Sequence, residues 1–390
     1  MATSLSVPSV SITRITQPPG EHWFGYYDKT PWADDDDKVL AMRATFRNRQ
    51  PTPNDAIDLG ILIPSESFRF ERFASTTAWC WQQGTMLQWL PKREETVVYN
   101  GRRNNKFVGV VRDLQRRHET TLDRALYAVD PEGRYAVGLN FSRLASHRPG
   151  YGYEGIPDPY TTNPSPAKDG LWKIDLDSGK STLLLSLAAV VSLEPDPAMA
   201  NHVHWLNHAQ INTSGTRIAC LHRWQPEHGP RQTRLLTVGN DGSSPRIVWA
   251  ARHVSHYDWC NEDEILVWGG QPAAPNSFWQ ISDAGHPARP FAPNLLCEDG
   301  HCSFSPDRRW LVTDTYPNQA RLRILKLVRV ADESCIDIGA FYAPPELDGP
   351  TRVDLHPRWN REGTQLCIDS AHEGTRQMYV ADVEPVMNCM

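Results

Sequence analysis

Four histidines open four similar segments in the second half of the chain. The segments align without gaps: HAQINTSGTRI (208–218), HYDWCNEDEIL (256–266), HCSFSPDRRWL (301–311) and HPRWNREGTQL (356–366). Imidazoles that recur at one position of a repeat and converge in the fold can bind a metal ion or transfer protons. His208, His256, His301 and His356 are therefore the first candidates for a functional site. The alternative is that they only pack in the interior or cap strands.

Each of these segments continues from the histidine through an apolar or aromatic residue and a polar turn into an apolar stretch. Three weaker copies occur earlier in the chain: TPWADDDDKVL (30–40), QWLPKREETVV (88–98) and LYAVDPEGRYA (126–136). Apolar alternation on both sides of a tight turn indicates β-hairpins, and a further strand follows each copy. Most copies are spaced near the ~40–50 residues of a four-stranded propeller blade.

The repeats predict an all-β fold, a single seven-bladed β-propeller over residues 1–390. Few residues follow the last copy, so we expect the N-terminal segment VSITRIT to supply the strand that closes the last blade. The longest gap between copies contains an insertion rich in Gly, Pro and Tyr at 142–170. Long connections of this kind are often functional, and we expect this one to cross one face of the ring as a lid.

Composition narrows the classes of partner. Lysine and arginine number 40 and aspartate and glutamate 46, for a net charge of −6, and no long basic run is present. We therefore expect no nucleic-acid partner. No apolar stretch of ~18 residues predicts a membrane span. The N-terminus lacks the pattern of a secretory signal, and the eight cysteines form no CxxC pair, so we expect a cytoplasmic protein with reduced thiols. The oligomeric state is left open.

In a propeller, the first strand of each blade lines the central channel, and the turn after the second strand returns to the same face. Cations and aromatic residues dominate these expected rim positions, although the protein is acidic overall. We expect a small anionic ligand held there by arginine forks. The alternative is solvated hairpin tips. The candidate substrate-binding residues are Arg102, Arg143, His222, Tyr316, His372 and Arg376, and Arg223 belongs to the same rim.

The segment GEHWFGYYDKTPW (20–32) is unusually aromatic. Such density builds either a surface on which a sugar ring stacks or part of the core. Tyr27 is our candidate for a tyrosine that faces the ligand, and Tyr26 is a second.

At these residues the chain resembles the oligogalacturonate lyase family and, more loosely, the ulvan lyases, which are seven-bladed propeller polysaccharide lyases. The resemblance covers roughly residues 200–375, and the first half matches only in blade pattern. It is carried by HAQINTSG with CLHRW, QTRLL (232–236), SHYDW (255–259), EDGHCSFSPD (298–307) and DLHPRW (354–359).

The resemblance implies a divalent metal, manganese in type, held by His301 and His356. Where the family has a further histidine this chain has Asp354, and the family's glutamine ligand has no clear equivalent. A carboxylate in place of an imidazole provides a hard oxygen ligand, which changes the preference of the site among metals. Zn²⁺ and Ca²⁺ are therefore alternatives to manganese. The resemblance also implies catalytic roles for Arg234 and His256.

The implied reaction is β-elimination on a small anionic, uronate-containing oligosaccharide. It requires neutralisation of the uronate carboxylate, a base that removes the C5 proton and an acid for the leaving O4. Three readings remain open: this lyase, another sugar-acid enzyme such as a hydrolase or epimerase, and a non-catalytic binding module of the TolB or WD type. The candidates for the base are His208, His256 and an arginine such as Arg223, and those for the acid are Tyr26, Tyr27 and His222.

Overall fold

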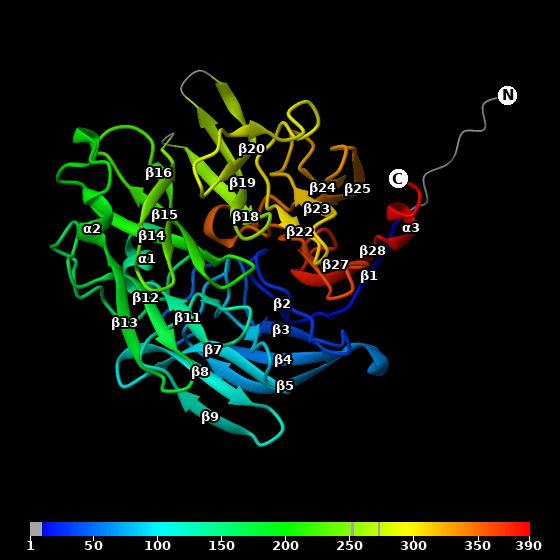
Figure 1. Ribbon diagram of the computed structural model, residues 1–390. Coiled ribbons are helices and arrows are strands. Elements are labelled where there is room, and N and C mark those ends of the chain that lie inside the picture. The colour runs from blue at the N-terminus through cyan, green and yellow to red at the C-terminus, as the bar shows by residue number, and fades with distance from the viewer. Residues whose placement is uncertain (1–9, 251–252, 272–273) are drawn as a thin grey trace.

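Seven four-stranded antiparallel sheets are arranged in a ring in this computed structural model (Figure 1). The structure describes residues 10–250, 253–271 and 274–390. The ring confirms the seven-bladed β-propeller that the repeats predict. Residues 1–9, on which the expectation of no secretory signal mostly depends, lie outside the described residues.

The blades follow one another along the chain, each with its innermost strand first. Blade 1 contains β2 (Glu21–Trp23), β3 (Val39–Ala44), β4 (Ile57–Ile63) and β5 (Arg69–Thr76), and blade 2 contains β6 (Gln88–Trp89), β7 (Thr96–Arg103), β8 (Lys106–Asp113) and β9 (His118–Thr121). Blade 3 contains β10 (Ala128–Val129), β11 (Tyr135–Gly138), β12 (Gly170–Asp175) and β13 (Ser181–Ser186), and blade 4 contains β14 (His204–Ile211), β15 (Arg217–Trp224), β16 (Gln232–Gly239) and β17 (Arg246–Trp249).

The last three blades are built in the same way. Blade 5 contains β18 (Val254–Trp259), β19 (Glu264–Gln271), β20 (Ala274–Ser282) and β21 (Arg289–Pro290), and blade 6 contains β22 (Ser303–Phe304), β23 (Trp310–Asp314), β24 (Leu322–Arg329) and β25 (Cys335–Tyr342). Blade 7 contains β26 (Arg358–Trp359), β27 (Gln365–Ser370), β28 (Gln377–Asp382) and β1 (Ser11–Arg14). Short helices are α1 (Phe141–His147), α2 (Leu187–Ser192) and α3 (Glu384–Met387).

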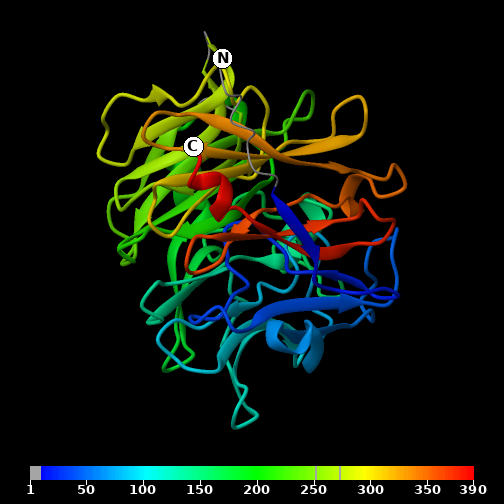
Figure 2. The same cartoon turned by 90° about the vertical axis from the view of Figure 1, so that its right-hand side faces the viewer.

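The N-terminal strand closes the ring, as predicted. Strand β1 pairs antiparallel with β28, with Ser11 opposite Asp382 and Arg14 opposite Tyr379. Figure 2 shows the blue N-terminal strand beside the red C-terminal strands. This pairing covers the outer edge of β28 and joins the two ends of the chain in one blade.

Apolar side chains fill the spaces between blades. In blade 4, for example, the middle strand β15 is buried at seven of its eight residues, and Ile218 and Cys220 pack into the core shared with blade 3. All eight cysteines are free thiols. Within the described part of the chain, no helix has the length and apolarity that a membrane span requires.

The insertion at 142–170 leaves blade 3 after β11 and returns at β12. It begins as helix α1, whose first turn is capped by the Asn140 side chain. Beyond the helix, the Tyr151 hydroxyl contacts Arg352 Nη2 at 2.9 Å. The backbone N–H of Gln82 donates to the Gly150 carbonyl. The insertion therefore bridges blade 3, the connection between blades 1 and 2 and the connection between blades 6 and 7.

Arg143 anchors this insertion from inside. Its Nη1 contacts the Asp158 carboxylate at 2.8 Å, and its Nε donates to the His204 carbonyl at 2.7 Å. Its other bonds go to carbonyl groups of Tyr160, Asn163 and Pro164. Both side chains of the Arg143–Asp158 pair are almost fully buried.

Replacement of Arg143 by alanine is expected to lower the free energy of unfolding by about 3–5 kcal/mol, because Asp158 would keep a buried, unpaired charge. Denaturant unfolding measures the change, and Lys168→Ala, at an exposed position of the same insertion, is the control. A loss of less than about 1 kcal/mol, the range of exposed ion pairs, would show that Arg143 is not the anchor.

Candidate functional site

Three side chains that could hold a metal ion meet near the centre of the ring. His301 precedes β22, and Asp354 and His356 precede β26, so neighbouring blades 6 and 7 supply them. One ligand atom from each residue lies within 4.8 Å of the others, and all three residues are buried. The three residues are those proposed from the sequence. A buried set of two imidazoles and one carboxylate can hold a divalent cation.

The hydrogen bonds of the two histidines favour this interpretation. His301 Nδ1 donates to the Asp314 carboxylate at 2.8 Å, which leaves a lone pair on Nε2. Among the described residues, the buried Nε2 atoms of His301 and His356 have no hydrogen-bond partner. A buried polar atom without a partner costs free energy, so a ligand at this position would satisfy both. The site therefore fits a metal ion, which would bind both unpartnered nitrogens.

Asp314 positions both histidines. Besides the His301 ring, its carboxylate accepts the backbone N–H of His301 at 2.8 Å and that of His356 at 3.3 Å. The backbone of His356 is left-handed, with φ of +44°, a conformation that is uncommon for residues other than glycine. Carboxylates that orient metal-binding imidazoles commonly contribute to metal affinity.

Asparagine in place of Asp314 is expected to weaken metal binding about 10–100-fold while the fold is retained. The reason is that a neutral amide holds the His301 imidazole less firmly and supports its basicity less. Titration with metal against a competing chelator measures the affinity. Asp337→Asn, at an exposed carboxylate in the same blade, should leave it unchanged. Equal affinities for the Asp314 variant and the wild type would remove Asp314 from the site.

Asp354 is shared between the candidate metal site and two arginines. Its carboxylate lies 2.7 Å from Arg323 Nη2 and 2.8 Å from Arg352 Nε. Burial favours the neutral acid, but Arg352 and Arg323 outweigh it and lower the pKa of Asp354 below its ordinary value. Burial, with His301 nearby, lowers the pKa of His356. At neutral pH the site therefore presents a carboxylate and a neutral imidazole, the forms that bind metals.

His256 is hydrogen-bonded to Asp299 beside the candidate metal site. It lies on β18, its ring centroid is 4.2 Å from that of His301, and its Nδ1 contacts Asp299 Oδ1 at 2.8 Å. A proton held on Nδ1 by Asp299 leaves the Nε2 lone pair free. Burial lowers the pKa of His256, so the ring is neutral at pH 7. The pair has the arrangement of a general base oriented by a carboxylate.

The two adjacent tyrosines have different hydrogen bonding. The Tyr27 hydroxyl donates to the Tyr257 carbonyl at 2.9 Å and accepts the Tyr257 N–H at 3.1 Å. The Tyr26 hydroxyl makes no hydrogen bond with the described residues, and its ring lies 5.0 Å from that of His356. Burial raises the pKa of both, so both are protonated at neutral pH. Tyr26 therefore has the more available proton.

His208 faces the other side of these tyrosines. Its ring lies 4.9 Å from that of Tyr26, and its Nε2 is 3.7 Å from Asp28 Oδ2. Asp28 is also paired with Lys29 at 2.8 Å. Burial lowers the pKa of His208 to about 4. His208 is thus a neutral imidazole next to a buried ion pair, separated from the metal candidates by Tyr26 and Tyr27.

Three arginines near this site have no carboxylate partner among the described residues. Arg223, on β15, is only 4% exposed, and its Nε and Nη1 atoms have no hydrogen-bond partner within the described residues. The Nε atoms of Arg148 and Arg231 are also buried and unpartnered there. Burial and the nearby Arg148 lower the pKa of Arg223 to about 10. Burial, with Arg223 nearby, lowers the pKa of Arg231 to about 9.

Arg148, Arg223 and Arg231 are here called the arginine cluster, and at these pKa values Arg223 and Arg231 remain cationic at neutral pH. The groups that favour the charged form of Arg223 are the hydroxyls of Tyr26, Tyr151 and Tyr127, and no carboxylate is among them. The guanidinium of Arg148 lies over the Tyr151 ring at 4.4 Å, and Tyr151 in turn contacts Arg352, the partner of Asp354. Uncompensated buried cations are the electrostatic requirement for binding an anion.

The structure also places the remaining residues proposed from the sequence. Tyr316 lies at the centre, with its ring 6.0 Å from that of His301. Arg234 Nε donates to His222 Nδ1 at 2.9 Å, and its Nη atoms donate to the Val190 and Glu194 carbonyls next to α2. His222 in turn contacts His204 at 2.9 Å. Arg234 and His222 thus satisfy each other within blade 4.

The other four rim candidates are engaged elsewhere. Arg143 is bound within the insertion, as described above, and Arg102 Nη1 donates to the Pro53 carbonyl. His372 lies between Phe341 and Tyr379, and its Nδ1 contacts Ser370 Oγ. Arg376 donates to the Thr351 and Arg352 carbonyls. The residues brought together at the centre are His208, His256, His301, His356, Asp354, Tyr27, Tyr316 and, at its edge, Arg223.

Sequence reasoning did not single out Arg148, Arg231 or Asp299. Arg148 belongs to the insertion, and Arg231 precedes β16, so neither occupies a position that the repeat predicts. Asp299 had a usable signal, because it lies two residues before His301 in EDGHCSF.

Comparisons with known proteins agree with the fold. No family model matches this chain, and no curated protein is similar to it in sequence. An oligogalacturonate lyase from Vibrio parahaemolyticus has a TM-score of 0.68 at 15% identity, over 96% of this chain and 94% of that chain. An oligogalacturonate lyase in complex with manganese has a TM-score of 0.68 at 14% identity, over 95% and 92%.

A third solved structure has the same general architecture. The Cps50 (Swd1) β-propeller domain of Myceliophteria thermophila has a TM-score of 0.51 at 10% identity, over 95% of this chain and 99% of that chain. At these identities the likeness establishes the propeller fold alone. The chain therefore combines a fold similar to that of oligogalacturonate lyases with a buried His–Asp–His candidate metal site.

Proposed function

We propose that this protein is a metal-dependent lyase that cleaves uronate-containing oligosaccharides by β-elimination. The observation that carries the proposal is the pairing of a buried two-histidine, one-carboxylate ligand set with cations that have no anionic partner in the described part of the chain. The first can bind a divalent ion and the second can bind a carboxylate. Manganese is the ion we expect first, since an oligogalacturonate lyase of similar fold is known in complex with it.

The reaction needs a neutralised carboxylate before the C5 proton becomes acidic enough to remove. A divalent ion bound by His301, Asp354 and His356 would supply Lewis-acid stabilisation of the charge that develops on the carboxylate. Arg223 and its neighbours in the arginine cluster would bind anionic groups of the saccharide and orient them. Charges fixed in a buried site stabilise a developing anion more strongly than water does.

The proton transfers are assigned to His256 and Tyr26. His256 Nε2 removes the C5 proton, and the electron pair of that C–H bond forms the C4–C5 double bond as the C4–O4 bond breaks. Tyr26 gives its phenolic proton to the departing O4. Atoms and electrons balance without an oxidant: the C5–H and C4–O4 bonds break, and the C4–C5 π bond and a new O4–H bond form. The products are an unsaturated uronate and a saccharide with a new hydroxyl, and His256 and Tyr26 regain their starting forms when one proton leaves His256 and one returns to Tyr26 through solvent.

Two earlier candidates fit these roles less well on hydrogen-bonding grounds. The Tyr27 hydroxyl is engaged on both sides by Tyr257, whereas that of Tyr26 is not. Arg234 is held by His222 and by carbonyl groups next to α2. We therefore assign the acid to Tyr26, and we assign the guanidinium that contacts substrate to Arg223 rather than Arg234.

The burial of the site favours a short substrate. His301, His356 and Arg223 are at most 4% exposed. The ring of Tyr151, from the insertion, meets that of Tyr26 edge-on, with 6.3 Å between the ring centroids. A polymer could not thread through such a site, whereas an oligosaccharide of a few residues could be enclosed after the insertion moves. We thus expect cleavage of di- and trisaccharides in preference to long chains.

A screen of uronate oligosaccharides tests this function. The protein is first stripped of metal, and turnover is followed by the ultraviolet absorbance of the conjugated product, with and without added Mn²⁺, Zn²⁺ or Ca²⁺. We expect absorbance to rise only with a divalent ion and to stop on addition of chelator. Equal turnover with and without metal would contradict the proposed role of the ligand set, and absence of turnover on every uronate would contradict the lyase.

A further inference from the structure

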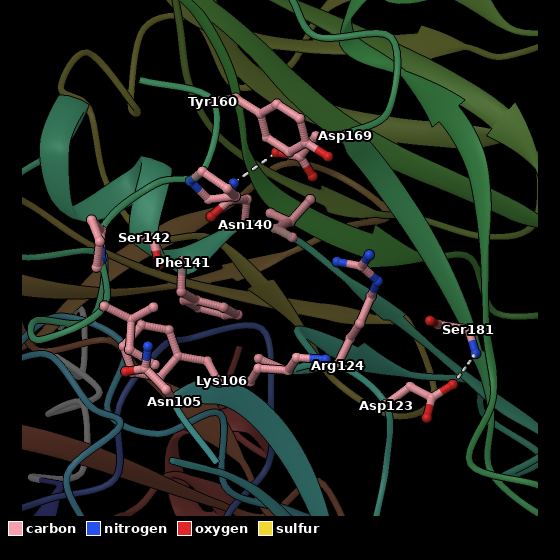
Figure 3. Close-up of a pocket in the computed structure, with 16 residues that line it drawn as sticks. Asn105, Lys106, Asp123, Arg124, Asn140, Phe141, Ser142, Tyr160, Asp169 and Ser181 are labelled. Atoms are coloured by element: carbon pink, nitrogen blue, oxygen red, sulfur yellow. Dashed lines mark hydrogen bonds between the residues drawn. The ribbon is translucent and has the colours of Figure 1, made fainter. Parts of the chain in front are cut away.

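A cavity of about 720 Å³ lies outside the candidate metal site, between blades 2 and 3 and the insertion (Figure 3). Its walls come from the β7–β8 turn, the segment before blade 3, the start of α1 and the insertion around residues 156–160. None of the metal-ligand candidates or members of the arginine cluster lines it. Its size is typical of sites that enclose a small ligand.

Arg124 supplies a positive charge to this cavity. Its guanidinium stacks on the Trp172 ring at 3.3 Å, and within the described residues its side chain makes no ion pair or hydrogen bond. Figure 3 shows it directed toward the part of the cavity lined by Asn140 and Asp169. A guanidinium that is fixed by an aromatic ring and keeps its N–H groups free is preorganised for a carboxylate.

The carboxylates in the same walls already have donors. Asp169 accepts from Asn140 Nδ2 at 2.7 Å and from Trp172 Nε1 at 3.2 Å. Asp123 accepts the backbone N–H of Ser181 at 3.3 Å. Lys106 is a second cation at the exposed edge of the cavity. The wall therefore offers two cations that are not held in ion pairs with it.

The rest of the wall contains both polar and apolar groups, as a sugar ring requires. Hydroxyl and amide groups can bond ring hydroxyls, and apolar side chains can cover the C–H faces. The polar groups are Asn105, Ser142, Tyr160 and Ser181, since the Asn140 amide is engaged by Asp158, Asp169 and the Arg143 N–H, and the apolar ones are Phe107, Leu139, Phe141, Ile156, Pro157 and Pro159.

We propose that this cavity is a second saccharide site, separate from the metal centre, which binds a hexuronate through Arg124. The Arg124 fork takes the carboxylate, and the amide and hydroxyl groups take the ring hydroxyls. This site does not depend on the lyase activity, because no residue of the proposed catalytic machinery belongs to it. A second uronate molecule could occupy it while another is cleaved at the metal site.

Calorimetric titration with D-galacturonate and D-glucuronate tests the proposal on two protein backgrounds, the wild type and the variant His301→Ala/His356→Ala. The second background removes the metal site and isolates the cavity. We expect both backgrounds to bind a uronate, and Arg124→Gln to weaken that binding by about tenfold or more, as loss of a charged hydrogen bond predicts. Arg116→Gln, at an exposed arginine of blade 2 outside the cavity, is the matched control and should change nothing.

Three results would overturn the second site. Unchanged affinity in Arg124→Gln would remove the arginine from it. Equal affinity for D-galactose and D-galacturonate would show that no carboxylate is recognised, and stronger binding of inorganic phosphate than of either uronate would assign the cavity to a phosphate. Failure of the proposed lyase function would look different: the wild type would show no turnover, while the His301→Ala/His356→Ala variant would still bind a uronate.

Discussion

Alanine at His356 is expected to abolish tight metal binding and to lower kcat/KM on a uronate oligosaccharide about a thousandfold. The substitution removes one of three ligand atoms that lie within 4.8 Å of one another. It also removes one of two buried imidazole nitrogens that have no partner among the described residues. Loss of one charge-stabilising group in a buried active site commonly costs about 10²–10³ in kcat, and here the ion is lost with it.

Metal content by atomic spectrometry and turnover on the same sample measure this effect. His372→Ala is the control, because His372 belongs to the same blade but contacts Phe341, Tyr379 and Ser370 instead of the centre. Since His356 has a positive φ, thermal unfolding of each variant checks that the fold is retained. Full metal content in His356→Ala would show that the ligand set is wrongly assigned.

Arg223→Met is expected to lower kcat/KM about 10²–10³-fold while leaving the protein as stable as the wild type or more stable. Methionine fills much of the same space without a charge. A buried guanidinium with unpartnered nitrogens destabilises the fold, so its removal relieves a cost instead of breaking a contact. Opposite changes in activity and stability are typical of groups retained for function.

A second buried arginine serves as a control, because it shows what the removal of a buried but paired charge does to stability. Arg358, in blade 7, is equally buried but pairs with Asp369 at 2.6 Å. Arg358→Met should lower the free energy of unfolding by about 3–5 kcal/mol, because Asp369 is left unpaired. Arg223→Lys should recover only part of the activity, since lysine keeps the charge and loses the fork. A comparable loss of stability in Arg223→Met would mean that Arg223 is structural.

The repeat made the fold predictable, because a hairpin pattern with a fixed leading residue defines both the blade and its inner end. His256, His301 and His356 were found in this way, and successive rings lie 4.2 and 4.3 Å apart in the structure. The same reasoning predicted that β1 completes blade 7. Position within the repeat therefore predicted which imidazoles reach the centre, but not that Tyr26 and Tyr27 separate His208 from the other three.

Strand register limited the prediction of the rim. His222 and Arg223 are neighbours on β15, so their side chains point to opposite faces of the sheet. One face leads to His204 and Arg234, the other to Tyr26 and the arginine cluster. The sequence supplied both residues but not the face that each occupies.

The insertion was the least predictable part. The sequence located it and suggested that it crosses a face of the ring, but its contacts depend on tertiary packing. Arg143 was expected at the rim, and it is instead the internal anchor of the insertion through Asp158. Arg148 comes from the same segment and reaches the arginine cluster only because the chain beyond α1 folds back to Tyr151 and Arg352.

The masses of the products from one defined uronate disaccharide test the central claim most directly. Metal-loaded protein is incubated with the substrate, and the products are separated and weighed by mass spectrometry. Elimination predicts two products whose masses sum to that of the substrate, one of them unsaturated. Products that together exceed the substrate by one water would identify a hydrolase, and an isomer of unchanged mass an epimerase; either would contradict the lyase.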